Sequence, residues 1–291
     1  MAGRPELTTR PSIRALLSAP GCTVLPGAAE VLSARIMEEQ GFEAVYAGGN
    51  AIGLAHGKAQ PFVSAVETAD TISRIVRATG CAVLADVGAG FGEGAHLDQA
   101  IREIEAAGAG GIHIDDQPYP KPVGYHRGEG RLETLDIVRS RFEVACKARR
   151  DSDTLLIART DALRVTGDID EVVTRGRALQ SAGAEALIVL DLDPAQAGRV
   201  REALPDLPLI WIGGVKAPVP SQDDLHKAGF DMALFPFLTV AAMASAVTEL
   251  WGMFAETGRV SVDEAKLPDM LKLAGRISGL PRAFQIDEEA V

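Results

Sequence analysis

One stretch of the sequence decides the fold, CAVLADVGAGFGEGAHLDQAIREIEAAGAGGIHIDD, which covers residues 81–116. The apolar run at residues 82–86 predicts a buried strand, because a short apolar run bounded by turn residues is typical of a strand covered on both faces. Residues 97–107 carry apolar side chains at helical spacing and end before Gly108, which favours a helix that stops at this glycine. A second apolar run follows at residues 111–115. The stretch therefore predicts a strand, a helix and a second strand parallel to the first.

The same alternation of short apolar runs and amphipathic segments continues along most of the chain. The predicted strands are 23–26, 44–47, 82–86, 111–115, 154–159, 186–190, 209–212 and 232–236. The predicted helices are 29–40, 66–79, 97–107, 132–149, 169–182, 194–204, 222–228 and 239–256. Strands that alternate with helices of this length favour a parallel sheet. Eight such units predict a (β/α)8 TIM barrel, since an open doubly wound sheet rarely has eight regular repeats.

We expect one barrel domain over residues 1–258, with a lead-in helix before the first strand. Residues 259–291 form additional C-terminal helices, with a helical pattern over 262–277 and no strand beneath it. This tail either belongs to the same domain or packs on a neighbouring subunit.

Composition excludes several classes of partner. The chain has 29 Lys and Arg against 40 Asp and Glu, a net charge of −11. Such a surface repels phosphate backbones and anionic lipid head groups, which argues against nucleic acid and membranes as partners. The 3 cysteines are widely spaced and predict neither a disulfide framework nor a zinc site. No apolar run has the length of a signal peptide or a membrane span, so a cytoplasmic location is the expectation.

Four carboxylates stand at the ends of predicted strands. Active sites of TIM barrels lie at the C-terminal ends of the strands, where Asp86, Asp115, Asp161 and Asp191 are found. Convergent carboxylates suit a hard divalent cation such as Mg²⁺. Arg159, also at a strand end, suits a substrate carboxylate, which it can bind through two parallel hydrogen bonds. The alternative is that each Asp only caps the helix that follows it.

A glycine-rich run at residues 88–94 follows the third predicted strand. Its glycines allow the backbone to approach a ligand closely. Residues 90–95 also resemble a dinucleotide fingerprint, with Asp115 as the acid that would bind the ribose. Asp86 would face the pyrophosphate unfavourably, which makes this the weaker interpretation.

A long loop, residues 116–130, follows the fourth predicted strand. Long ordered loops at this face of a barrel are often lids over the active site. Lys121, Tyr125, His126 and Arg127 could each donate a proton or neutralise an oxyanion, whereas a solvated surface loop is the alternative. His113 lies within a predicted strand, which favours a buried packing role.

Five segments in order resemble the isocitrate lyase and phosphoenolpyruvate mutase superfamily, which includes 2-methylisocitrate lyases, oxaloacetate decarboxylases and carboxyphosphonoenolpyruvate mutases. The segments are 26–27, 45–49, 85–92, 113–117 with 120–121, and 157–162. The resemblance spans about residues 10–258. It implies a (β/α)8 barrel in a homo-oligomer, a dimer or tetramer with exchanged C-terminal helices. It also implies Mg²⁺ and a small 2-oxo or 2-hydroxy acid whose C–C or P–C bond reacts through an enolate-like intermediate.

The metal site that the resemblance implies contains Asp86 and Asp115. Asp86 matches the direct ligand, and Asp115 matches a glutamate of the metal shell. Gly88 and Ala59 stand where the superfamily usually has two further aspartates. We therefore expect weaker metal binding than in a typical member.

The resemblance assigns substrate binding to four residues. Arg159 matches the arginine that binds the substrate carboxylate, and Tyr46, Gly48 and Gly49 match the segment whose amides hold the oxyanion. Gly48 replaces the serine that is usual in this segment.

The loop carries the largest departure from the superfamily. The lyases have Lys-Arg-Cys-Gly-His, whereas this chain has Lys121, followed by Pro122, Val123 and Gly124, and then Tyr125 and His126. Val123 has no proton to give, so a standard isocitrate or methylisocitrate lyase is not expected. Lys121 matches the lysine of the closing loop, and His126 or Tyr125 takes over proton delivery.

The sequence leaves three hypotheses open. The first is a Mg²⁺-dependent carbon–carbon bond lyase or decarboxylase, with Lys121, Tyr125, His126 and Arg159 as catalytic residues. The second is a mutase or hydrolase of the P–C bond of a phosphonate, which would not need the cysteine. The third is a relative that binds a ligand without turnover.

Overall fold

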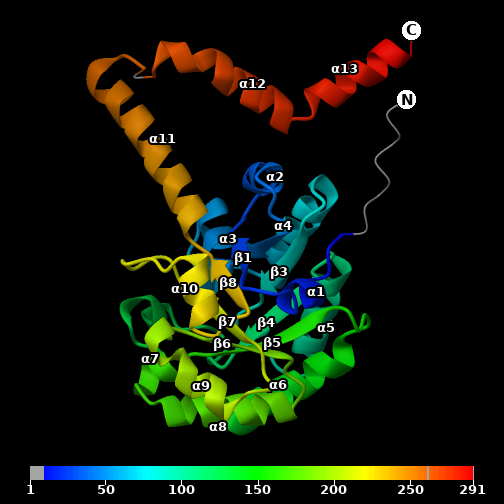
Figure 1. The fold of residues 1–291 in the computed structure, drawn as a ribbon, viewed down its shortest axis with the longest axis vertical. Coiled ribbons are helices and arrows are strands. Elements are labelled where there is room, and N and C mark those ends of the chain that lie inside the picture. The colour runs from blue at the N-terminus through cyan, green and yellow to red at the C-terminus, as the bar shows by residue number, and fades with distance from the viewer. Residues whose placement is uncertain (1–9, 261, 291) are drawn as a thin grey trace. The chain divides into compact units, whose positions relative to one another are not determined.

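The structure, a computed structural model, describes residues 10–260 and 262–290. Its eight parallel strands form one sheet in the order β1-β8-β7-β6-β5-β4-β3-β2 (Figure 1). They are β1 (Thr23–Pro26), β2 (Ala44–Ala47), β3 (Ala82–Asp86), β4 (Gly111–Asp115), β5 (Leu155–Thr160), β6 (Ala186–Val189), β7 (Leu209–Ile212) and β8 (Met232–Phe235). A parallel bridge between Gly27 and Tyr46 joins the two ends of this order. The predicted (β/α)8 barrel is confirmed.

Helices alternate with the strands and cover the outside of the barrel (Figure 1). The covering helices are α2 (Val31–Glu39), α4 (Ala65–Ala78), α5 (Ala95–Ala106), α6 (Leu135–Ala148), α8 (Ile169–Ser181), α9 (Ala197–Ala203) and α10 (Gln222–Lys227). The sequence predicts each of them, with ends displaced by a few residues. It does not predict the short helices α3 (Gly49–Ala55) and α7 (Ala162–Thr166), which lie in loops after strands and are too short to show a helical period.

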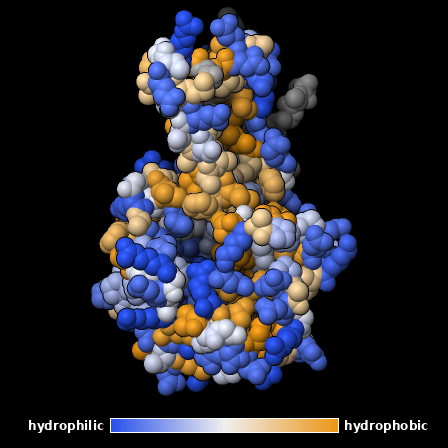
Figure 2. Space-filling view, turned by 90° about the vertical axis from the view of Figure 1, so that its left-hand side faces the viewer, coloured by the Kyte–Doolittle hydropathy of each residue, from blue (hydrophilic) through white to orange (hydrophobic). Residues whose placement is uncertain are grey.

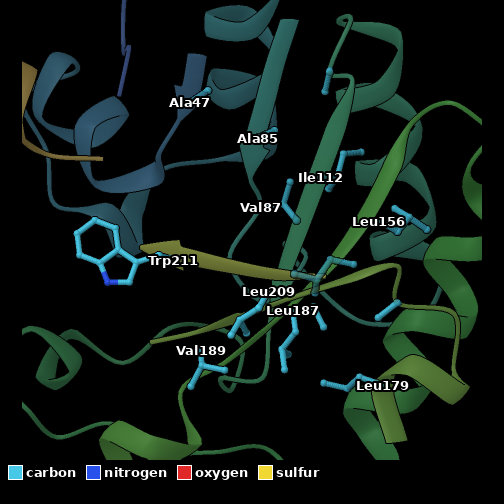
Figure 3. Close-up of a cluster of buried hydrophobic side chains, with 14 of the residues drawn as sticks. Ala47, Ala85, Val87, Ile112, Leu156, Leu179, Leu187, Val189, Leu209 and Trp211 are labelled. Atoms are coloured by element: carbon cyan, nitrogen blue, oxygen red, sulfur yellow. The ribbon is translucent and has the colours of Figure 1, made fainter. Parts of the chain in front are cut away.

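The apolar core has two layers. Strand residues that face outward pack against the covering helices, as Ala85, Ile112, Leu156 and Leu187 do in Figure 3. Strand residues that face inward fill the barrel together with α1 (Ile13–Leu17), the lead-in helix.

The alternation of side chains along each strand also places the polar residues. A residue two positions beyond an inward-facing one faces inward as well. Leu84 on β3 and Ile157 on β5 belong to the inner layer, so Asp86 and Arg159 face the interior at the C-terminal ends of these strands. This is the end at which TIM barrels carry their active sites.

A second compact unit begins at Val240. Its helices are most of α11 (Leu238–Thr257), α12 (Leu267–Ile277) and α13 (Leu280–Glu289). The helix predicted over 262–277 begins later than expected, at Leu267, after a 3-10 turn at Glu264–Lys266. Pro268 lies in the first turn of α12, where the missing N–H leaves no hydrogen bond unmade. Within residues 10–260 and 262–290, α11 is the one helix that is long and apolar enough to cross a membrane by length and composition alone.

Candidate active site

A pocket of about 300 Å³ lies at the C-terminal ends of the strands. Six residues that the sequence singles out line it: Tyr46, Gly48, Asp86, Tyr125, His126 and Arg159. Gly49 and Lys121 line a smaller cavity that shares Asp86 with the first. Asp115 is fully buried and lines neither cavity, but it forms an ion pair with Lys121, which lines the smaller one. The structure thus brings the predicted site residues together from β2 to β5 and from the loop after β4.

Backbone amides hold the carboxylate of Asp86. Oδ1 accepts a hydrogen bond from Gly88 N at 2.9 Å, and Oδ2 accepts one from Gly49 N at 3.0 Å. A Cβ at position 49 would lie 3.3 Å from Oδ2 and 2.9 Å from Gln60 Nε2, so a larger residue would displace the Gln60 side chain and crowd the carboxylate. Burial favours the neutral acid, but the charges of the nearby Lys121 and Arg159 and the hydrogen bond from Gly88 N outweigh it and hold the pKa of Asp86 well below its usual range. Asp86 is therefore a carboxylate at neutral pH.

Asp115 and Lys121 form a buried ion pair below the loop. Lys121 Nζ lies 3.2 Å from Asp115 Oδ2, and both side chains are almost fully buried. Neither of these two atoms has a hydrogen-bond partner. Asp115 Oδ2 thus faces the Lys121 ammonium but accepts no hydrogen bond, and a buried carboxylate oxygen in this state is a group that a further cation satisfies.

This donor set fits a Mg²⁺ ion of modest affinity. No group of three or more His, Cys, Asp or Glu side chains that could hold a metal occurs among the residues that the structure describes. Mg²⁺ is nevertheless often bound by one or two carboxylates while it keeps several waters. Asp86 and Asp115 supply those two carboxylates. Gly88 leaves space beside them, since a Cβ there would be 3.9 Å from Asp115 Oδ2.

Arg159 is held in place by Asp161, for which the sequence allows either a role in the site or a role as a helix cap. Arg159 Nε donates to Asp161 Oδ1 at 3.0 Å, and both side chains are buried. Gln117 Nε2 donates to the other oxygen of Asp161 at 2.6 Å. The Asp161 side chain makes no capping hydrogen bond to α7, so it orients the arginine instead.

The hydroxyl of Tyr125 lies between two arginines. Its oxygen accepts hydrogen bonds from Arg159 Nη2 and Arg164 Nη1, each at 2.9 Å. Burial raises the pKa of Tyr125 to about 12, although the two guanidinium groups act in the opposite direction. Because the oxygen receives two N–H donors, its own proton must point away from them. His126 is exposed on the surface and packs its ring edge-on to the ring of Tyr125.

Sequence reasoning missed three polar residues of the site. His113 is buried as expected, but its Nε2 lies 2.7 Å from Tyr46 Oη and 3.6 Å from Asp86 Oδ1. Two-residue spacing from Asp115 was the signal that places His113 on the inner face. Gln60 and Arg164 also line the pocket, from a 3-10 turn at Gln60–Phe62 and from α7, for which the sequence offers no comparable signal.

The glycine-rich run contains an acidic residue with a structural role. Glu93, within this run, forms an ion pair with Arg141, whose side chain is fully buried. Glu93 therefore connects the loop after β3 to α6, which carries Arg141.

Comparison with known proteins agrees with this geometry. Residues 13–253 match the phosphoenolpyruvate phosphomutase family. The chain belongs to this family. The superfamily resemblance seen in the sequence is thereby confirmed, and the chain is an enzyme of the phosphoenolpyruvate mutase and isocitrate lyase superfamily.

Individual members of the superfamily align over most of their length. The 2,3-dimethylmalate lyase of Eubacterium barkeri is 30% identical over 250 residues, which are 84% of this chain and 86% of that protein. The 2-methylisocitrate lyase of Aeropyrum pernix is 34% identical over 242 residues, 80% of this chain and 76% of that protein. Among solved structures, oxaloacetate acetylhydrolase in complex with 3,3-difluorooxalacetate has a TM-score of 0.87 at 26% identity, covering 98% of this chain and 97% of that one.

Proposed function

We propose that this enzyme is a Mg²⁺-dependent carbon–carbon bond lyase or decarboxylase that acts on a small 2-oxo or 2-hydroxy carboxylic acid through an enolate-like intermediate. One observation carries the proposal. Asp86, a candidate metal ligand, and Arg159, a candidate carboxylate ligand, line a single pocket into which the Tyr125 side chain also reaches. The names of the relatives, 2,3-dimethylmalate lyase and 2-methylisocitrate lyase, support a small carboxylic acid as the substrate.

Asp86 and Asp115 would hold the Mg²⁺ ion. When bound, it would supply positive charge against the negative charge that develops on the substrate oxygens. Lys121, already paired with Asp115, closes the loop over these carboxylates and helps to exclude water.

Arg159 binds and orients the substrate carboxylate. Its guanidinium is fixed by Asp161, so little rotational freedom is lost when the substrate arrives. The Gly49 amide is already donated to Asp86, which leaves Gly48 as the glycine of this segment whose amide serves the substrate oxyanion. Tyr46, beside Gly48, forms the floor of this part of the pocket.

Tyr125 delivers the proton in the place of the missing cysteine. When the C–C bond of a 2-oxo acid breaks, CO2 leaves its electron pair on the substrate as an enolate, whose carbon takes the Tyr125 proton, and the Tyr125 phenolate regains a proton from water. A 2-hydroxy acid must in addition lose its hydroxyl proton to water as that oxygen becomes a carbonyl. A hydroxyl whose oxygen is bound by two guanidinium groups is a better acid in the transition state, because both cations stabilise the phenolate that forms. His126 is the second candidate for this role.

The test is a substrate screen on the purified protein with Mg²⁺, using oxaloacetate, malate and phosphonopyruvate. Turnover of oxaloacetate or malate supports the proposal, and turnover of phosphonopyruvate alone would move the enzyme to the P–C bond chemistry. Asp86→Asn should abolish turnover and weaken metal binding, whereas Asp70→Asn, in an exposed pair with Arg74, should change neither. Full activity of Asp86→Asn, or no Mg²⁺ binding by the native protein at millimolar concentration, would contradict the proposal.

We also propose that the enzyme is a cytoplasmic homo-oligomer. Helix α11 buries no residue, and its large apolar side chains Val247, Trp251 and Phe254 are exposed. Figure 2 shows hydrophobic side chains, in orange, exposed on the face that it presents. Exchange of C-terminal helices between copies, in a dimer or tetramer, would cover the apolar side chains of α11. Light scattering after gel filtration should give a dimer or tetramer without detergent, and a monomer that needs detergent would favour a membrane instead.

A further inference from the structure

Two consecutive residues after β4, Asp116 and Gln117, contact the end of β5 from opposite faces of the sheet. Arg159 on β5 faces the interior of the barrel, so the next residue, Thr160, faces the covering helices. Asp116 contacts Thr160 on this outer face, whereas Gln117 contacts Asp161, the partner of Arg159, on the inner face. The strand end that carries Arg159 is therefore held on both sides.

On the outer face, Asp116 uses both oxygens of its carboxylate. Oδ1 accepts a hydrogen bond from the backbone N–H of Asp161 at 2.9 Å, and Oδ2 accepts one from the hydroxyl of Thr160 at 2.6 Å. Arg175 Nη1, from the covering helix α8, also donates to Oδ2 at 3.3 Å, and both side chains are buried. Moving the strand end would leave these buried groups unpaired, which is unfavourable, so the backbone at Asp161 is fixed.

On the inner face, Gln117 fixes the side chain of Asp161. Gln117 Nε2 donates to Asp161 Oδ2 at 2.6 Å, while Oδ1 of the same carboxylate accepts a hydrogen bond from Arg159 Nε at 3.0 Å. Asp116, Gln117 and Asp161 are buried and line neither cavity of the active site. Any effect of these residues on a ligand in the pocket therefore passes through Arg159.

Asp116 also closes the base of the long loop after β4. Its carbonyl oxygen accepts a hydrogen bond from Glu133 N at 2.8 Å, and Arg175 Nη1 donates to the carbonyl oxygen of Glu133 at 3.1 Å. One buried residue thus holds both ends of this loop and the strand end that carries Arg159.

We propose that Asp116 and Gln117 are positioning residues for Arg159, which set the direction in which its guanidinium faces the pocket. This inference rests on the proposed function, in which Arg159 binds the substrate carboxylate. A guanidinium binds a carboxylate through two parallel hydrogen bonds, which require the two groups to lie in one plane. Without the contacts from Asp116 and Gln117, Asp161 is free to turn, and the plane of the Arg159 guanidinium turns with it.

The first test removes the inner contact alone. Gln117 Oε1 is buried without a hydrogen-bond partner, so Gln117→Met, which has a similar volume, loses only the side-chain hydrogen bond to Asp161. Binding of oxalate, an inert small dicarboxylate, is measured by isothermal titration calorimetry with Mg²⁺ present, and the stoichiometry reports the fraction of folded protein. We expect oxalate to bind about tenfold more weakly, the effect of one hydrogen bond to a charged group. Gln99→Met, at an exposed position on α5, is the matched control and should leave oxalate binding unchanged.

The second test acts on the outer contact. Thr160→Val removes the hydroxyl that donates to Asp116 and accepts from Ala162 N, whereas Thr160→Ser retains it. We expect Thr160→Val to weaken oxalate binding by about threefold or more, and Thr160→Ser to bind oxalate as the native protein does. The affinity for Mg²⁺ alone should stay native in Gln117→Met and in both Thr160 variants, because Arg159 is not a candidate metal ligand.

Arg159→Gln separates this inference from the proposed function. It should weaken oxalate binding by about a hundredfold, because both hydrogen bonds to the carboxylate are lost. If oxalate binding falls in Arg159→Gln but stays native in Gln117→Met and Thr160→Val, the inference is overturned and the role of Arg159 stands. A parallel loss of Mg²⁺ affinity in Gln117→Met and Thr160→Val would also overturn it, since the whole site is then disturbed. Native oxalate binding by Arg159→Gln would overturn the carboxylate-binding role of Arg159 and the inference with it.

Discussion

Tyr46 and His113 meet inside the barrel, where the hydroxyl oxygen of Tyr46 lies 2.7 Å from Nε2 of His113. Both side chains are buried, and burial is the main cause that lowers the pKa of His113 and raises that of Tyr46. A neutral imidazole therefore faces a neutral hydroxyl directly beneath the carboxylate of Asp86. This pair connects the inner layer of the core to the floor of the active site.

Removing one member of this pair should destabilise the protein. Tyr46→Phe leaves a buried ring nitrogen without its partner, which we expect to lower the free energy of unfolding by about 1–3 kcal/mol. The double variant Tyr46→Phe/His113→Leu should lose less than the sum of the two single variants, because no polar partner then remains unpaired. Urea unfolding of the four proteins of this double-mutant cycle measures the coupling, and strictly additive losses would contradict it.

Replacing the Tyr125 hydroxyl should slow the chemical step. Tyr125→Phe removes the proton donor, and we expect kcat to fall by about 10²-fold or more. Because the pKa of Tyr125 is raised to about 12, the native enzyme should keep the protonated, active phenol up to about pH 10. His126→Gln is the matched comparison and should keep nearly normal rates. If His126→Gln shows the larger loss, the donor role passes to the histidine.

Thiol reagents should not inhibit this enzyme. Burial raises the pKa of Cys22 and of Cys81 to about 11, so both are unreactive thiols at neutral pH. The third cysteine, Cys146, does not line the active-site pocket. Incubation with N-ethylmaleimide, followed by an activity assay and mass spectrometry, should show full activity even where Cys146 is modified. Rapid loss of activity would place a cysteine in the chemistry.

The buried charge of Arg141 depends on Glu93. Arg141 Nη1 also donates to the carbonyl oxygen of Gln117 at 2.7 Å, which fixes the chain just after β4. Glu93→Gln should lower the free energy of unfolding by about 2 kcal/mol, less than for a fully buried pair because half of the Glu93 side chain is exposed. Arg74→Gln, which breaks an exposed pair with Asp70, should leave stability nearly unchanged. Equal losses in the two variants, measured by urea unfolding, would contradict this difference.

Acid should destabilise the start of α4 through Glu67. Its hydrogen bonds to Lys58 and Ser64 lower the pKa of Glu67 to about 2, from an unfolded value near 4.5. A lowered pKa means that the stabilisation is complete above about pH 4.5 and disappears as the pH falls towards 2. Glu67→Gln should therefore differ most from the native protein in melting temperature above pH 5, and the difference should shrink on acidification. Glu249→Gln is the control, and a difference that grows towards low pH would contradict the assignment.

The sequence alone determined the eight strands and the positions of the site along them. Short apolar runs separated by helical periods fix the order of elements, and alternation along β3 is enough to turn Asp86 inward once Leu84 is buried. The local pattern of the sequence also located the loop that carries Lys121 and Tyr125. These features depend on neighbours in the chain, which is why they are readable there.

Only the tertiary structure decided which side chains meet. Asp161 is near Arg159 in sequence, but its role as the orienting partner depends on Gln117 from the loop after β4. His113 becomes part of the site because the pairing of β2 and β4 with the two sides of β3 brings Tyr46 and His113 together on the inner face. The active-site pocket likewise combines residues that lie in, or directly after, six different strands. No local pattern specifies such contacts, since they arise from the register in which separate strands pair around the barrel.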